Sequence, residues 1–112
     1  MKLEDLNTNI KTPTDLLKDK INHSSNFSRL YLALDIIFNQ NNTKSIKIKD
    51  LFDIECFSSW GNGLLFRRVD TLVRLGLLHK DNRKKYNNYV LNNKLLFDKD
   101  LIKLAKEKIG IE

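Results

Sequence analysis

Six cations in two short groups are the residues of this sequence whose types and spacing best suit a chemical task. Arg67, Arg68 and Arg74 stand at helical spacing in one segment, and Arg83, Lys84 and Lys85 follow one another in the next. Guanidinium and ammonium groups donate several hydrogen bonds each and bind phosphate oxygens, with arginine able to do so through a bidentate fork. The pattern therefore predicts a surface that binds a polyanion.

The distribution of charge favours the same interpretation. The net charge is +6, and residues 67–94 hold eight lysines and arginines against two aspartates, a surplus that equals the charge of the whole chain. Crowded charge of one sign destabilises a compact state through self-repulsion. We therefore interpret the cluster as a binding surface rather than as a solvated face that serves only solubility.

Residues that could carry catalysis or hold a metal are sparse. The single Cys56 and the two widely separated histidines, His23 and His79, offer no pair at metal-ligand spacing. Carboxylate pairs such as Asp98 and Asp100 are of the kind that cap helix first turns. We therefore expect a protein that is not an enzyme and that needs neither a metal nor another cofactor.

Length and composition limit the architecture to one domain. The chain has 112 residues, of which 41% are hydrophobic and 30% charged, so it is expected to fold around a single core. It contains no run of about 18 apolar residues, and its N-terminus, MKLEDLNTNIKT, lacks the pattern of a signal peptide. We expect a cytoplasmic protein without membrane contact.

The first half of the chain is predicted to be mainly helical. A loose arm over residues 1–11 precedes a helix that starts at Thr12–Pro13, and Asn22–Ser25 interrupts it. A stronger amphipathic helix is expected over Ser25–Asn39. A very short strand at residues 45–48 then leads into one or two helical turns.

The second half predicts a longer helix, a hairpin and a final helix. The longer helix places Leu65, Val69 and Leu72 on one side, opposite the arginines, and Gly76 ends it in a left-handed conformation. A β-hairpin with a charged tip follows, and the final helix covers about residues 95–109. The expected fold class is mainly α with a small β-hairpin (α+β).

The segment VDTLVRLGLLHKDNRKKYNNYVLN resembles the second half of a winged helix-turn-helix domain of the MarR/ArsR kind. Val69, Leu72, Gly76 and Leu77–Leu78 match the pattern of that family, and Arg83–Lys85 occupy the tip of its wing. The resemblance covers roughly residues 25–92. It implies a single winged-helix domain over residues 12–112 with extra N-terminal and C-terminal helices, divided into a helix-turn-helix at about 47–76, a wing at about 77–92 and a C-terminal helix at about 95–109.

The turn before the third helix of this domain departs from the family. About three residues more than in the common tight turn separate Leu51 from that helix, around Ser58–Gly61. Either the turn is longer and Asn62 caps the helix, or the helix begins at Ser58. In both cases Trp60 is interpreted as a plug that holds the turn against the core.

The resemblance implies that the partner is double-stranded DNA. Small or polar residues at the start of the third helix would let its backbone approach base edges, and Arg68, on its flank, would bind a backbone phosphate. The wing tip would lie along phosphates or enter a minor groove. The predicted DNA-binding residues are Asn62, Gly63, Arg67, Arg68, Thr71, Arg74, Arg83, Lys84 and Lys85.

A small transcriptional regulator that acts as a homodimer is the function that this resemblance implies first. A TubR-like centromere-binding adaptor of a plasmid or phage partition system, with a filament protein as its partner, is the first alternative. A winged-helix module for protein-protein interaction is the second. The helices around Pro13–Ile21 and Lys99–Ile109 either form a dimer surface or pack on their own domain.

Overall fold

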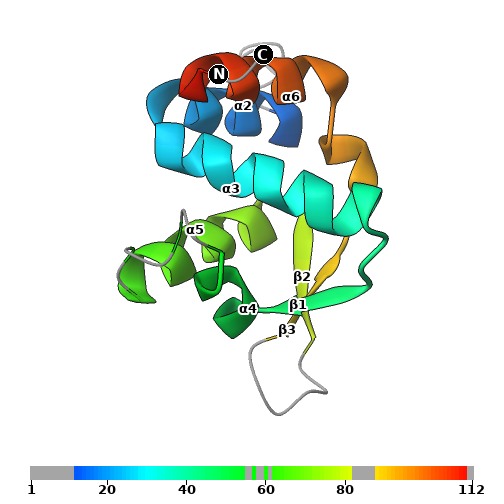
Figure 1. Ribbon diagram of the computed structural model, residues 1–112. Helices are drawn as coiled ribbons and strands as arrows, with labels where there is room; N and C mark the ends of the chain where they lie inside the picture. The colour runs from blue at the N-terminus through cyan, green and yellow to red at the C-terminus, as the bar shows by residue number, and fades with distance from the viewer. Residues whose placement is uncertain (1–11, 55–56, 58–59, 61, 82–87, 111–112) are drawn as a thin grey trace, which may run out of the picture.

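The computed structural model of the protein describes residues 12–54, 57, 60, 62–81 and 88–110. This part of the chain is mainly helical and carries a three-stranded antiparallel sheet, so the α+β class is confirmed. Helices α2 and α6 lie at one end of the molecule, α3 crosses its middle, and α4, α5 and the sheet form the other end (Figure 1). The elements are α2 (Pro13–His23), α3 (Ser25–Asp35) with a π-helical continuation η1 (Ile36–Gln40), β1 (Ser45–Lys47), α4 (Ile48–Phe52), α5 (Asn62–Arg74), β2 (Leu78–Asp81), β3 (Asn88–Leu91), a 3-10 turn η3 (Lys94–Leu96) and α6 (Lys99–Ile109).

The first two helices begin where the sequence predicts, because each has a hydroxyl cap. The Thr12 side chain accepts a hydrogen bond from the Asp15 amide, and the Asp15 carboxylate accepts one from the Thr12 amide, each at 3.2 Å. Ser24 Oγ accepts from the Phe27 amide at 3.1 Å and so caps α3. The interruption between the helices is shorter than predicted, since α2 continues to His23.

The predicted hairpin gains a third strand. Strands β2 and β3 pair antiparallel, and β1 pairs with the other edge of β3, which gives the order β1-β3-β2. In β1 only Ile46 is buried, and it lies opposite the buried Tyr89 of β3. This single apolar position explains why so short a strand still has a defined register.

The final helix begins later than predicted, at Lys99 instead of about residue 95. Residues 94–96 form the turn η3, and Asp98 Oδ1 then accepts from the Asp100 amide at 2.7 Å as the cap of α6. The buried Tyr31 hydroxyl of α3 holds the segment between them, because it donates to the Leu96 carbonyl at 2.6 Å and accepts from the Asp98 amide at 3.2 Å. The chain therefore changes direction before α6 starts.

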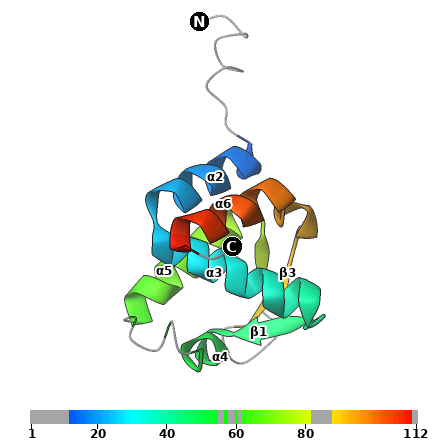
Figure 2. The ribbon, with the colours of Figure 1, turned by 45° about the horizontal axis from the view of Figure 1, so that its top comes forward.

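Helices α2 and α6 pack on their own domain. Leu17 and Ile21 of α2 and Leu101 and Ala105 of α6 are buried in one core with the apolar stripe of α3. The two helices lie side by side over α3 in both ribbon views (Figures 1 and 2). Within the described residues, no helix combines the length and the apolar character needed to cross a membrane.

A Schellman motif joins α5 to the sheet. Gly76 has a φ of +87°, its amide donates to the Val73 carbonyl at 3.1 Å, and the Leu77 amide donates to the Leu72 carbonyl at 3.0 Å. The side chain of Asn92, just after β3, donates to the Gly76 carbonyl at 2.8 Å. The predicted left-handed glycine is confirmed, and these bonds set the orientation of α5 against the β2–β3 hairpin.

Candidate nucleic-acid interface

Helix α5 is amphipathic in the way that the sequence predicts. Leu65, Val69 and Leu72 are fully buried, while Gly63 and Arg67 are exposed on the opposite side. Exposed Asp70 and Arg74 share that outer face, and Thr71 is half-buried at its edge. The helix therefore presents a mainly polar surface, which we call the outer face of α5, with the exposed Phe66 at its edge.

The structure places the start of this helix at Asn62, with Trp60 in a bend before it. Of the two alternatives, the longer turn therefore agrees with the structure. Asn62 is the first residue of the helix, and its side chain, which the sequence predicts as the cap of α5, lies outside what the structure describes. Ser58, Ser59 and Gly61 lie outside the described residues.

Trp60 is partly buried against the core, as the plug interpretation predicts. Its ring packs edge-on against fully buried Phe57, with 4.8 Å between the ring centroids. The guanidinium carbon of Arg68 lies 5.4 Å from the centroid of the Trp60 ring, within the range of a cation–π contact. Trp60 therefore also positions a cation on the flank of α5.

The two adjacent arginines have different surroundings. Arg67 is exposed, whereas Arg68 is half-buried and its Nε atom is buried with no hydrogen-bond partner among the described residues. Burial lowers the pKa of the Arg68 guanidinium, and the positive charge of Arg67 lowers it further. Arg68 is thus a charged donor with unused hydrogen-bonding capacity in a region of positive potential.

Two of the predicted site residues have partners inside α5. The Thr71 hydroxyl donates to the Arg67 carbonyl at 3.0 Å. A guanidinium nitrogen of Arg74 lies 3.0 Å from a carboxylate oxygen of Asp70, and both side chains are largely exposed. An exposed pair one helical turn apart contributes only a few tenths of a kcal/mol, so Arg74 can exchange Asp70 for another anion.

The sheet contacts α5 through strand β2. Burial raises the pKa of the Tyr89 hydroxyl on β3, and the negative charge of Asp70 raises it further. His79 and Lys80 of β2 are exposed beside it. The predicted wing-tip residues, Arg83, Lys84 and Lys85, lie outside the described residues, between β2 and β3 in the chain.

Helix α5 also borders a hollow of about 180 Å³, which the sequence does not predict. Lys20 of α2 and Phe27 of α3 line it from one side, and four residues of α5 line it from the other: Leu64, Arg67, Arg68 and Thr71. Helix α3, strand β1 and helix α4 separate Lys20 from Arg67 in the sequence. No local pattern could have predicted that these two cations share a hollow.

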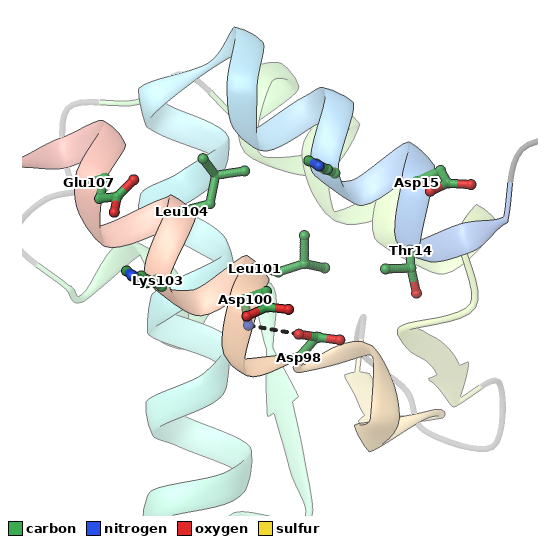
Figure 3. A pocket seen from close by; sticks show the side chains of 9 residues that line it. Thr14, Asp15, Asp98, Asp100, Leu101, Lys103, Leu104 and Glu107 are labelled. Carbon is green, nitrogen blue, oxygen red and sulfur yellow. Dashed lines mark hydrogen bonds between the residues drawn. The ribbon is translucent and has the colours of Figure 1, made fainter.

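A second hollow, of about 530 Å³, lies between α2 and α6 (Figure 3). Among its carboxylates, Asp15 and Asp98 serve as helix caps, and Lys18 and Lys103 also line it. The mixture of charges and the structural use of the acids give it no net preference for an anion. Among the described residues, no group of three or more His, Cys, Asp or Glu side chains could hold a metal ion.

Comparisons with protein-family models, with curated proteins and with solved structures gave no match for this chain. Its function is therefore inferred from its own surface chemistry and from the order of its elements.

Proposed function

We propose that this protein binds double-stranded DNA as a winged helix-turn-helix protein, with α5 as the recognition helix and the β2–β3 hairpin as the wing. The order of strand, short helix, longer helix and hairpin in β1, α4, α5, β2 and β3 is the order that the resemblance implies. It acts by binding and not by catalysis. A small transcriptional regulator that works as a homodimer is the role that we assign to it.

The observation that carries the proposal is the chemistry of the outer face of α5. A glycine and an arginine stand there on an exposed, amphipathic helix, and Arg68 and Arg74 extend the positive charge to its flank and its end. A helix of this kind fits the major groove, where arginine binds guanine in a bidentate manner and backbone phosphates attract the flanking cations. Arg83, Lys84 and Lys85 continue the charge in the segment between the wing strands.

A homodimer follows from the size of the site. One recognition helix reads only a short stretch of duplex, and proteins of this type gain specificity by binding two half-sites. The apolar stripes of α2 and α6 are buried in their own domain, so these stripes are not free to form the contact. Exposed Ile36 and Leu95 are apolar residues still open to a second copy among those described.

A mobility-shift experiment tests the proposal. The purified protein is titrated onto DNA from upstream of its own gene and onto random duplex, at a low and a moderate salt concentration. Selective, salt-sensitive retardation supports a regulator, and a ladder of bands on an array of repeats supports the partition adaptor instead. Absence of any retardation at low salt would contradict DNA binding and favour a module for protein-protein interaction.

A further inference from the structure

The hollow beside α5 contains more positive charge than its own residues neutralise. Lys20, Arg67 and Arg68 line it together with the half-buried Thr71, and there is no carboxylate among the described residues that line it. The hydroxyl of Thr71 is used inside the helix, in its bond to the Arg67 carbonyl. The remaining donors are therefore two guanidinium groups and one ammonium group.

Arg68 is held in place before any ligand arrives. Its guanidinium carbon lies 5.4 Å from the centroid of the Trp60 ring, within the range of a cation–π contact, and burial of its Nε atom restricts the side chain further. A cation fixed in this way loses little conformational entropy when it binds an anion.

The size and composition of the hollow match a tetrahedral oxyanion. Its volume is about 180 Å³, which leaves room for one phosphate group and its water, and Phe27 and Leu64 form an apolar wall. Such a wall lowers the local dielectric constant and strengthens the attraction between the cations and an anion. Guanidinium groups bind phosphate oxygens in a bidentate manner, which a chloride ion cannot reproduce.

We propose that this hollow is a phosphate-binding site formed by Lys20, Arg67 and Arg68, and that in the DNA complex it holds a backbone phosphate next to the groove that α5 enters. The second part rests on the proposed function. The hollow lies between α5 and the helices α2 and α3, whereas the sheet contacts α5 through β2. The wing and the hollow would then bind phosphates at different sides of the recognition helix. A free phosphorylated molecule offers the same chemistry and is the other possible source of the group.

The neighbouring lysine of α2 gives a matched control. Lys18 and Lys20 are both exposed, but Lys18 lines the mixed-charge hollow between α2 and α6, whereas Lys20 lines the phosphate hollow. Lys18→Gln and Lys20→Gln therefore remove the same charge from the same helix at different sites. Both substitutions replace an exposed side chain, so both variants are expected to fold.

The first experiment uses inorganic phosphate and the free protein at constant ionic strength. Trp60 is the single tryptophan of the chain and contacts Arg68, so its fluorescence reports on the hollow, and the amide shift of Thr71 gives a second readout. We expect saturable changes in the wild type and in Lys18→Gln, and binding weaker by about tenfold in Lys20→Gln. Changes that do not saturate, or that are equal in the two variants, would overturn the site.

The second experiment measures binding to random duplex DNA as a function of salt. If the hollow holds a DNA phosphate, Lys20→Gln lowers the slope of log K against log salt by about 0.9, while Lys18→Gln leaves it unchanged. Equal slopes in the two variants, together with saturable phosphate binding, would assign the site to a free phosphate compound and overturn its role on DNA. If the wild type binds no duplex at all, the proposed function fails, and the phosphate titration alone decides whether the site exists.

Discussion

At the residue scale, the two adjacent arginines of α5 both line the hollow but differ in their surroundings. Arg68 is half-buried with its guanidinium carbon 5.4 Å from the centroid of the Trp60 ring, whereas Arg67 is exposed on the outer face of α5. A side chain that moves freely can adopt the bidentate geometry that guanine requires. A side chain that is already held suits a phosphate, whose position varies little with sequence.

The substitution Arg67→Ala tests this division. We expect a loss of about 1–3 kcal/mol in binding to the specific duplex and a smaller loss on random duplex, because a base contact is made only on the specific site. Fluorescence anisotropy on the two duplexes measures both values. Arg29→Ala, on α3, removes the same charge from outside the site and serves as the control. Equal losses on both duplexes would mean that Arg67 does not read bases.

The sequence predicts the type of each site residue better than its contacts. Helical periodicity is enough to place Arg67 outside and Arg68 on the flank, and the structure agrees. It could not predict the contact between Trp60 and Arg68, because Trp60 lies outside the helix and its position depends on the turn. Lys20 could not be assigned to the site either, since only the tertiary fold brings it to the hollow beside α5.

At the scale of elements, α5 contains one glycine, Gly63, and is followed by another, Gly76. A side chain fits at the first position but is strained at the second. Gly63 lies inside the helix on the exposed side, and a Cβ atom there would meet nothing within 4 Å. Gly76 ends the helix with a φ of +87°, where a side chain is strained even though the nearest atom to a Cβ would be 3.9 Å away. The helix therefore does not require glycine at position 63, whereas the left-handed conformation at position 76 favours glycine.

We expect the two alanine substitutions to change stability in opposite directions. Gly63→Ala raises the free energy of unfolding by about 0.5–1 kcal/mol, since alanine favours the helix. Gly76→Ala lowers it by about 1–2 kcal/mol, because the left-handed conformation is strained for alanine. Urea denaturation measures both. Equal changes in the same direction would contradict this account of the helix ends.

Gly63→Ala also tests the approach of α5 to DNA. If the backbone at this position lies against base edges, the added methyl group weakens specific binding although the protein is more stable. Anisotropy on the specific duplex, measured where both proteins are fully folded, shows the difference. Unchanged affinity would mean that the start of α5 does not approach the bases closely.

The contact between α3 and the segment before α6 gives a third test at this scale. Tyr31 is fully buried, and its hydroxyl bonds to both Leu96 and Asp98. Tyr31→Phe leaves that carbonyl and that amide without their partner, so we expect a loss of about 1–3 kcal/mol in the free energy of unfolding. Binding to DNA by the folded variant should not change, because α3 contacts α6 far from the outer face of α5. A variant as stable as the wild type would show that water replaces the hydroxyl.

Local sequence signals predict the start or end of a helix only where the signal is unambiguous. Thr12–Pro13 predicts the start of α2, the apolar periodicity predicts the start of α3 near Ser25, and Gly76 predicts the end of α5. The predicted start of α6, at about residue 95, is too early, because the apolar residues of η3 continue the helical pattern. The cap at Asp98 depends in part on the hydrogen bond that the Asp98 amide donates to the Tyr31 hydroxyl. Such a long-range contact is not visible in a local sequence pattern.

At the scale of the whole molecule, the excess positive charge and the packing helices lie at different ends. Helices α2 and α6 cover α3 at one end, while α5 and the sheet form the other (Figure 1). The surplus of charge between residues 67 and 94 therefore belongs mainly to α5 and the hairpin. If the protein binds DNA as proposed, it approaches DNA with α5 and the hairpin first, and the attraction weakens with salt.

The lysines of the predicted wing tip should contribute to this attraction without adding specificity. We expect the double substitution Lys84→Ala and Lys85→Ala to lower the slope of log K against log salt by roughly two on both specific and random duplex. Lys106→Ala with Lys108→Ala, on α6 at the other end, removes the same charge and should change the slope much less. Identical slopes for the two double variants would mean that the segment between β2 and β3 does not contact phosphates.

The measurement that tests DNA binding by α5 most directly is a map of amide chemical shifts during titration with duplex DNA. We predict that the largest shifts fall on residues 63–74 of α5 and on the strands β2 and β3, with little change in α6. Shifts that gather on α6 instead, or no shifts at low salt, would contradict the assignment of α5 as the helix that reads DNA.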